Sequence, residues 1–138
     1  MTLALDDPFP VTQDMKDRFR RDGFIKIKNV LSSSEIARIE PVISAVVADF
    51  EKAYPTLKDE GYYHKQFIQV NGTWRKYPGV REFSFSKRLA GLAADLMGVK
   101  AVRLYHDQAL YKLPGGSHTL HHQDLSYWPL ATDNACAL

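Results

Sequence analysis

The pattern of hydrophobic and polar residues first has a helical period and then changes to a strand-like one. Thr12 stands where a helix N-cap is expected, and Gly23 stands where that helix would end. Between them, Met15 and Phe19 lie four residues apart, on one helical face. Residues 24–30 (FIKIKNV) then follow with β-branched and aromatic residues, so we expect a strand there.

The best helical pattern in the sequence comes next. Ser32 and Glu35 have the spacing of a capping box, in which each residue satisfies a backbone amide of the other. Pro41 lies inside the pattern and predicts either a kink or a break into two helices. Tyr54 and Pro55 are expected to end it. The apolar positions that recur at helical intervals are Ile36, Ile39, Ile43, Val46, Val47 and Phe50.

The middle of the chain has weaker periodicity. Residues 56–77 are polar and aromatic without a clear period, apart from a short strand-like run at 67–71. Ser84 or Ser86 then caps a further helix, which Gly98 closes. The residues of that helix expected to point inward are Phe85, Leu89, Leu92, Ala93 and Leu96.

The period changes again after the last helix. Residues 99–113 are rich in β-branched and aromatic side chains and predict a long strand or a strand pair, broken by Pro-Gly-Gly at 114–116. Residues 135–138 would begin another buried strand. Helices first and strands later indicate an α+β fold, or helices packed on a β-sandwich, in one domain over 1–138.

Composition and charge narrow the class of protein. The content of 45% hydrophobic and 25% charged residues excludes intrinsic disorder. The net charge is +2, and most of the basic residues are scattered along the sequence. The one basic cluster lies on the first predicted helix, where a solvated face is expected rather than a nucleic-acid interface. That cluster consists of Lys16, Arg18, Arg20 and Arg21.

The expected location is the cytoplasm. Cys136 is the only cysteine, so an intrachain disulfide is excluded and a reducing compartment is expected. The N-terminal residues, with Asp6 and Asp7, do not resemble a signal peptide, and no apolar run reaches membrane-spanning length. We therefore expect neither a nucleic-acid nor a membrane partner.

The candidate chemistry lies near the C-terminal end. His118, His121 and His122 crowd together close to Asp124. On a strand, residues i and i+2 share a face, so His122 and Asp124 could reach one metal ion while Gln123 points away. Non-haem Fe(II) sites use two histidines and one carboxylate, so a third ligand is missing from this pair. The alternative interpretation is a surface hydrogen-bonded pair, because a bare His-x-Asp is common.

The same region carries a family resemblance. Residues 104–112 (LYHDQALYK), 114–116 (PGG) and 121–129 (HHQDLSYWP) resemble the phytanoyl-CoA dioxygenase family, and residues 22–32 resemble that family's opening. Its members are Fe(II)- and 2-oxoglutarate-dependent oxygenases built on a double-stranded β-helix, or jelly roll. The resemblance implies N-terminal helices packed on a jelly roll that is incomplete in this chain.

The resemblance also implies roles for individual residues. His122 and Asp124 match the first histidine and the carboxylate of the iron triad, and so become the catalytic metal ligands. Gln108 matches a position that touches 2-oxoglutarate, and Lys112 matches a lysine common at the strand end. Leu138 falls near a position that often carries a tryptophan beside the cosubstrate.

The rest of the site is expected elsewhere. In the family, the second histidine and the arginine that pairs with 2-oxoglutarate lie well downstream of His-x-Asp, so we expect this chain to be inactive alone. The upstream alternatives for a third ligand are His64, His106, His118 and His121. His106 is the best of these, because it would share a strand face with Gln108.

The functional expectation is a dioxygenase that uses molecular oxygen to hydroxylate an unactivated C–H bond of a small molecule or acyl-CoA. Retention of Asp124 implies hydroxylation rather than halogenation. The alternative is a non-catalytic truncated or pseudoenzyme domain that acts as a binding module through its aromatic surface. A zinc site is a third interpretation, disfavoured by the single thiol. Residues 62–74, Tyr127 and Trp128 are expected near the substrate.

Overall fold

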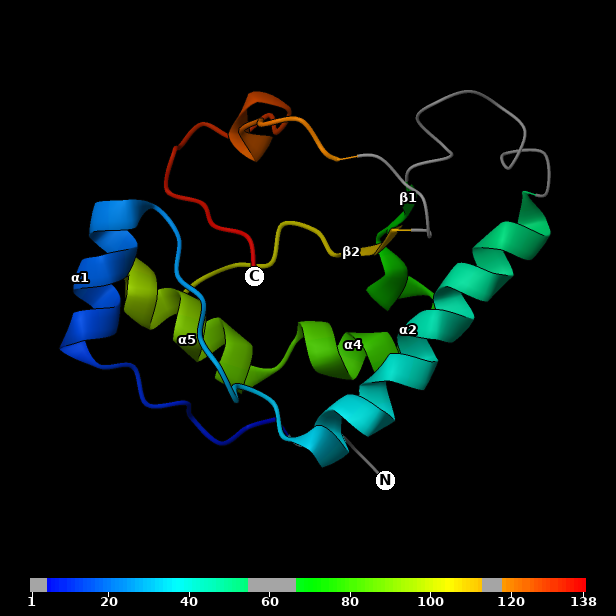
Figure 1. The fold of residues 1–138 in the computed structure, drawn as a ribbon, viewed down its shortest axis with the longest axis horizontal. Coiled ribbons are helices and arrows are strands. Elements are labelled where there is room, and N and C mark those ends of the chain that lie inside the picture. The colour runs from blue at the N-terminus through cyan, green and yellow to red at the C-terminus, as the bar shows by residue number, and fades with distance from the viewer. Residues whose placement is uncertain (1–4, 55–66, 113–117) are drawn as a thin grey trace.

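The computed structural model describes residues 5–54, 67–112 and 118–138 (Figure 1). Its elements, in order, are α1 (Gln13–Asp22), α2 (Ser33–Ala53), β1 (Phe67–Asn71), the short 3-10 helix η2 (Thr73–Arg75), α4 (Pro78–Ser84), α5 (Lys87–Met97), β2 (Gln108–Lys112) and the 3-10 helix η3 (Asp124–Ser126). Helices together with an antiparallel strand pair confirm the α+β content, whereas the jelly roll stays a prediction. Within the described ranges, no helix combines the length and apolar character needed to cross a bilayer.

The first helix forms where its caps predict it. The Thr12 hydroxyl accepts a hydrogen bond from the Met15 backbone amide at 3.3 Å. Gly23 ends the helix with a left-handed φ of 76°, a conformation that glycine adopts without steric cost, and donates to the Phe19 carbonyl. The predicted helix at the start of the chain is therefore confirmed at both ends.

The capping box of α2 is also confirmed. The Glu35 amide donates to the Ser32 hydroxyl at 3.2 Å, and the Ser32 amide donates to Glu35 Oε2 at 2.7 Å. The helix runs unbroken through Pro41, so the predicted alternative of two separate helices is wrong. Pro41 lies on the exposed side of α2, while Ile39 and Val46 are buried, so packing of the opposite face maintains the helix.

The strand predicted over residues 24–30 is wrong. The segment has no paired neighbour among the described residues, and a strand needs a backbone partner as well as a pattern. Asn29 also has a left-handed φ of 59°, which interrupts an extended run. The pattern does mark which side chains turn inward, because Ile25 and Ile27 are half-buried while Lys26 and Lys28 are exposed.

The sheet consists of β1 and β2, paired antiparallel from Phe67 opposite Lys112 to Asn71 opposite Gln108. The short strand at 67–71 is confirmed. The long strand predicted over 99–113 is wrong in extent, since among the described residues only 108–112 are paired, and residues 135–138 form no strand. Residues 55–66 and 113–117, which include the first half of the irregular stretch and the Pro-Gly-Gly break, lie outside the described residues.

The helical segment after β1 differs from the prediction in two respects. Helix α4, which was not predicted, begins with Pro78 in its first turn. Ser86, and not Ser84, caps α5 by accepting a hydrogen bond from the Leu89 amide at 3.2 Å. Phe85 is 48% exposed rather than inward, because it precedes the helix and its ring packs edge-on against Trp74.

The buried core lies between α2, α4 and the sheet. One cluster joins Val46 and Val47 of α2 to Val80 of α4 and Ala109 of β2, and a second joins Leu5 to Ile39. Helix α1 packs against α5 on the other side of the molecule (Figure 1). The α1 and α5 side carries the candidate site.

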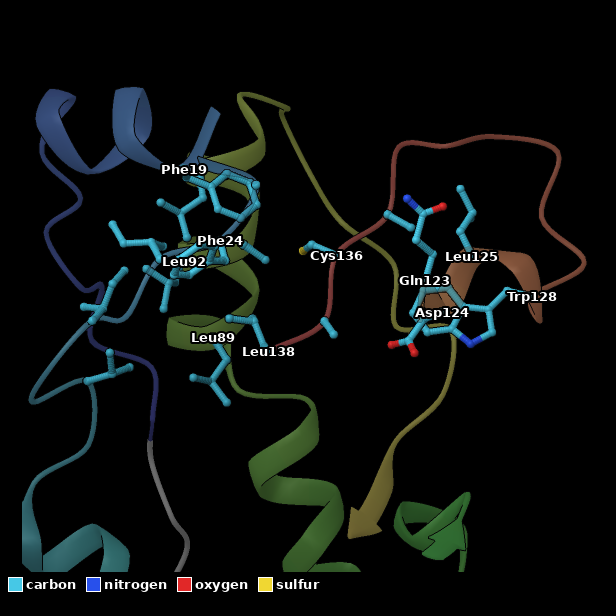
Figure 2. Close-up of a pocket in the computed structure, with 18 of the residues that line it drawn as sticks. Phe19, Phe24, Leu89, Leu92, Gln123, Asp124, Leu125, Trp128, Cys136 and Leu138 are labelled. Carbon is cyan, nitrogen blue, oxygen red and sulfur yellow. The ribbon is translucent and has the colours of Figure 1, made fainter. Parts of the chain in front are cut away.

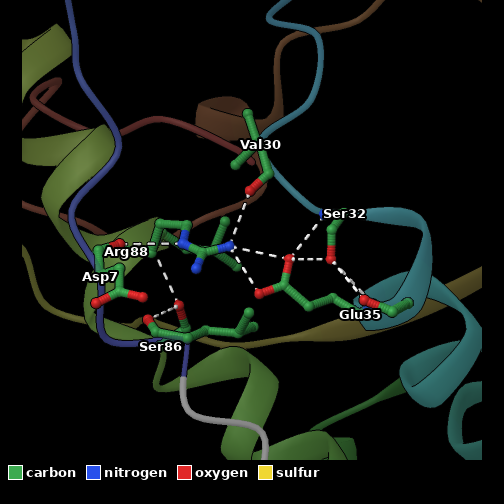
Figure 3. Close-up of polar contacts among 9 residues, drawn as sticks. Asp7, Val30, Ser32, Glu35, Ser86 and Arg88 are labelled. Atoms are coloured by element: carbon green, nitrogen blue, oxygen red, sulfur yellow. Dashed lines mark hydrogen bonds and ion pairs between the residues drawn. The ribbon is translucent and has the colours of Figure 1, made fainter.

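A polar junction ties the N-terminal segments to α5 (Figure 3). Arg88 Nη1 donates to the Val30 carbonyl at 3.1 Å and contacts Glu35 Oε1 at 3.0 Å, while Arg88 Nε donates to the Asp7 carbonyl at 3.0 Å. The Ser86 hydroxyl donates to the Leu5 carbonyl at 3.0 Å. The Arg88 guanidinium thus connects α5 to the N-terminal segment at Asp7, to Val30 and to the first turn of α2.

Candidate metal centre

His122 and Asp124 approach each other as the sequence predicts. His122 Nε2 lies 3.2 Å from Asp124 Oδ1, and the two side chains are 46% and 40% exposed. The other ring nitrogen, Nδ1, lies 2.8 Å from the Leu120 carbonyl oxygen. Both functional groups are therefore held by a partner and remain open to solvent on one side.

The contact with Leu120 fits one tautomer of the imidazole. A carbonyl oxygen only accepts, so His122 Nδ1 carries a proton and donates it to Leu120. Nε2 then faces a carboxylate oxygen, and a proton or a metal ion between them would satisfy both atoms. Donation of the second ring N–H to a backbone carbonyl is the usual arrangement of a metal-ligating histidine.

The distance also suits metal binding. Two ligands about 2.1 Å from one ion and at right angles to each other lie about 3 Å apart, close to the 3.2 Å between His122 Nε2 and Asp124 Oδ1. The pair therefore fits two adjacent positions on a divalent cation. The same geometry also fits a surface ion pair, the alternative drawn from the sequence.

The local backbone differs from the predicted strand. Gln123 is extended, with φ −116° and ψ 121°, but Asp124 begins η3. Because Gln123 is extended, the side chains of His122 and Asp124 still lie on the same side of the backbone. Figure 2 shows the Gln123 amide and the Asp124 carboxylate pointing in opposite directions. The spacing thus predicts the pair correctly although the expected strand is absent.

A third ligand does not join the pair within the described ranges, where no three side chains of His, Cys, Asp or Glu gather around one point. His118 and His121 are exposed. His106, the preferred alternative, packs its ring against Tyr105 and Trp128. His64 lies outside the described residues.

A cavity of about 1070 Å³ opens beside the pair (Figure 2). His122 and Asp124 line one side of it, and apolar side chains of α1, α5 and residues 24–31 line the other. Cys136 also faces it, and burial raises the pKa of its thiol above the ordinary value. Cys136 does not gather with His122 and Asp124 into a group of three ligands in the described structure. The arrangement can bind an apolar body next to a polar end.

The three positions assigned to the cosubstrate are separated. Leu138 is 73% exposed and lines the same cavity as His122 and Asp124. Gln108 lies at the start of β2, where its Oε1 accepts a hydrogen bond from Gln69, and Lys112 is exposed at the other end of β2. Neither lines the cavity. The structure thus brings together His122, Asp124 and Leu138 only.

Sequence reasoning missed Asp107. Its Oδ2 accepts hydrogen bonds from the Thr73 hydroxyl and, at 3.1 Å, from the Trp74 amide, and its carbonyl accepts from Gly72 at 2.8 Å. Its Oδ1 is buried and has no hydrogen-bond partner among the described residues. The sequence gives no signal that Asp107 joins β2 to the turn after β1, because its partners lie more than thirty residues away.

Comparisons with known proteins place these residues in a family. The family described as phytanoyl-CoA dioxygenase (PhyH) matches residues 19–138. A 2-aminoethylphosphonate dioxygenase of the uncultured bacterium HF130_AEPn_1 is 24% identical over 119 residues, which cover 82% of this chain and 44% of the relative. A methylphosphonate hydroxylase of Gimesia maris is 28% identical over 123 residues, which cover 83% of this chain and 44% of the relative.

The chain therefore spans less than half the length of these two relatives. No solved structure matches it.

Proposed function

The chain belongs to the phytanoyl-CoA dioxygenase family, and from this premise we propose that it carries part of an Fe(II)- and 2-oxoglutarate-dependent oxygenase that hydroxylates an unactivated C–H bond. The observation that supports this most directly is His122 Nε2 facing Asp124 Oδ1 at 3.2 Å, with Nδ1 held by Leu120. Both relatives carry names of oxygen-inserting enzymes, a dioxygenase and a hydroxylase.

The two described ligands have distinct roles in this proposal. His122 offers a lone pair on Nε2 because Leu120 holds the proton on Nδ1. Asp124 adds a negative charge that favours a divalent cation over a second proton. When bound, Fe(II) with 2-oxoglutarate and oxygen supplies the oxidising power for hydroxylation, coupled to formation of succinate and carbon dioxide. The third ligand and the arginine for 2-oxoglutarate come, in this proposal, from residues outside the described structure.

The cavity would hold the substrate. Its described lining includes Asp124 and Asp133 but no lysine or arginine, and most of the rest is apolar. The two relatives are named for small phosphonates. A phosphonate would need cations that this lining does not provide, so an apolar group, such as an acyl chain, suits the described walls better. Residues outside the described structure would have to supply any anion-binding site.

The test is turnover in the full-length protein. With Fe(II), 2-oxoglutarate and oxygen, we expect succinate release that increases with a suitable substrate from a panel of methylphosphonate, 2-aminoethylphosphonate and acyl-CoA. His122→Ala and Asp124→Ala should each reduce it at least a hundredfold, because each removes a metal ligand. The matched control is His121→Ala, which removes an exposed neighbouring imidazole. Unchanged turnover in either ligand variant would refute the assignment.

A second candidate function is a non-catalytic binding domain, which is favoured by the absence of a third ligand from the described residues. Anaerobic titration with Fe(II) separates the two functions. An oxygenase should bind one equivalent tightly in the full-length protein, whereas an isolated pair should bind weakly. The single thiol, Cys136, is consistent with the reducing cytoplasm, which we propose as the location.

A further inference from the structure

The candidate metal centre lies on a segment with few attachments to the rest of the chain. Within the described ranges, every hydrogen bond and ion pair of residues 118–138 joins two residues of that same segment. Figure 1 shows the segment arching away from α2 and the sheet before it returns toward α5. Hydrogen bonds therefore do not fix where Asp124 stands relative to the core.

Aromatic rings make a contact between this segment and the chain before β2. Trp128 contacts two rings from the segment that precedes β2, with centroid distances of 5.7 Å to Tyr105 and 5.5 Å to His106. Tyr105 and His106 contact each other at 5.0 Å. The His106 ring meets the other two nearly edge-on, a favourable geometry for aromatic pairs.

Backbone hydrogen bonds hold the residues on both sides of this ring contact. On one side, Asp107 is hydrogen-bonded to the turn at Gly72–Trp74 and Gln108 begins β2, so the backbone beside His106 is held on the sheet. On the other side, the Tyr127 amide donates to the Asp124 carbonyl at 2.9 Å, and the Trp128 amide donates to the Leu125 carbonyl at 3.3 Å. Trp128 therefore belongs to the same tight turn as Asp124.

We propose that His106 and Tyr105 are positioning residues that act through Trp128 to hold the η3 turn, and with it Asp124, in the geometry that binds the metal ion. This inference rests on the proposed function and adds a role for three rings that the family assignment leaves unexplained. It also assigns His106 a packing role in place of metal ligation, because its ring faces Tyr105 and Trp128 rather than His122 and Asp124.

The experiment compares two substitutions of one residue in the full-length protein. His106→Ala removes the ring, whereas His106→Phe keeps a ring and removes both nitrogens. Fe(II) affinity, measured by anaerobic titration, should fall about tenfold in His106→Ala, which is the lower limit of changes seen for outer-shell partners of metal ligands. His106→Phe should restore it to within about twofold of the wild-type value. The matched control is Tyr54→Ala, an exposed ring whose aromatic contact is with Phe50 of α2 and which should leave the affinity unchanged.

A second readout does not depend on metal. In a Trp74→Phe background, any tryptophan outside residues 1–138 contributes equally to every His106 variant, so the difference spectra report Trp128, the second of the two tryptophans in these residues. Its emission in the metal-free protein should shift to longer wavelength in His106→Ala and return in His106→Phe. The thermal unfolding midpoint shows that each variant is folded, and Tyr105→Leu replaces His106→Ala if the latter is not.

Three results would overturn the inference: unchanged affinity in His106→Ala, equal losses in the two His106 variants, or an unshifted Trp128 emission. Equal losses would mean that a ring nitrogen matters and that His106 is a ligand after all. Failure of the proposed function is distinguishable, because it would appear as Fe(II) binding that Asp124→Ala does not weaken. In that case the emission shift alone decides whether the rings position the turn.

Discussion

Arg88 and Glu35 form a shielded ion pair at 3.0 Å between the first turn of α5 and the first turn of α2, with side chains only 13% and 20% exposed. Glu35 also accepts a hydrogen bond from the Ser32 amide in the capping box. One carboxylate therefore caps its own helix, α2, and binds a side chain of a second helix, α5. The Arg88 guanidinium also holds the carbonyl of Val30, a residue that lines the cavity. The ion pair thus connects helix capping to the wall of the candidate site.

Replacement of Arg88 should destabilise the fold. Arg88→Met leaves Glu35 and the Val30 carbonyl without their partner, and we expect the free energy of unfolding to fall by about 2 kcal/mol in urea titrations. Lys87→Met is the matched control. Lys87 contacts Asp6 at 3.4 Å, but both side chains are mostly exposed, so that change should cost less than about 0.5 kcal/mol. Equal effects of the two variants would contradict the role given to Arg88.

Glu35 should make stability depend on acidity. The Ser32 backbone amide, assisted by the Ser32 hydroxyl and by Arg88, holds the pKa of the Glu35 carboxyl below its ordinary value. A carboxyl with a lowered folded-state pKa contributes stability that is present above its unfolded pKa and is lost as pH falls through the folded value. Denaturant titrations between pH 7 and pH 3 should therefore show a loss in acid that is smaller in Glu35→Gln. Parallel pH profiles for wild type and Glu35→Gln would argue against this linkage.

The elements that could be predicted are those whose causes are local. Thr12, Ser32 and Ser86 cap their helices through contacts with residues three positions ahead, and such spacing is visible in a sequence. The strand at 24–30 has the right alternation, but pairing depends on a distant partner that the described structure does not provide. Strand β2 is shorter than predicted for the same reason, because its pairing ends where β1 ends.

The candidate site, too, could be predicted only where its contacts are local in the sequence. The spacing of His122 and Asp124 is local and brings the two side chains together even though a turn replaces the strand. The contact of His106 with Trp128 and the hydrogen bonds of Asp107 join residues far apart in sequence, so no local pattern announces them. The positions expected for Gln108 and Lys112 came from the family resemblance, and their role at a cosubstrate site stays a prediction.

Close packing of α4 on α2 should make Gly79 intolerant of a side chain. A Cβ at Gly79 would lie 2.9 Å from Val42 Cγ1 and 3.3 Å from Val42 Cγ2. We expect Gly79→Ala to lower the free energy of unfolding by about 1–3 kcal/mol, the usual cost of overpacking, and Val42→Ala in the same chain to recover part of it. Gly91→Ala is the control, because nothing lies within 4 Å of a Cβ there. A neutral Gly79→Ala would show that the two helices separate easily.

Metal binding at His122 and Asp124 should stabilise the folded full-length protein without any contribution from Cys136. A metal that binds only the folded state raises its stability by about 2.7 kcal/mol at a hundredfold excess over the dissociation constant, so anaerobic Fe(II) should raise the unfolding midpoint. Asp124→Asn keeps the shape of the side chain but removes the charge, and should abolish most of that rise. Cys136→Ala should retain it, because the thiol does not gather with His122 and Asp124 in the described structure.

The two variants together test which side chains facing the cavity bind the ion. Loss of the Fe(II) effect in Cys136→Ala would mean that the thiol serves as a ligand, although the described structure does not bring it together with His122 and Asp124. Retention of the effect in Asp124→Asn would leave His122 and Asp124 as an ordinary ion pair, since only a proton would then lie between Nε2 and Oδ1. The stabilisation by Fe(II) therefore distinguishes a metal from a proton as the cation between the two acceptors.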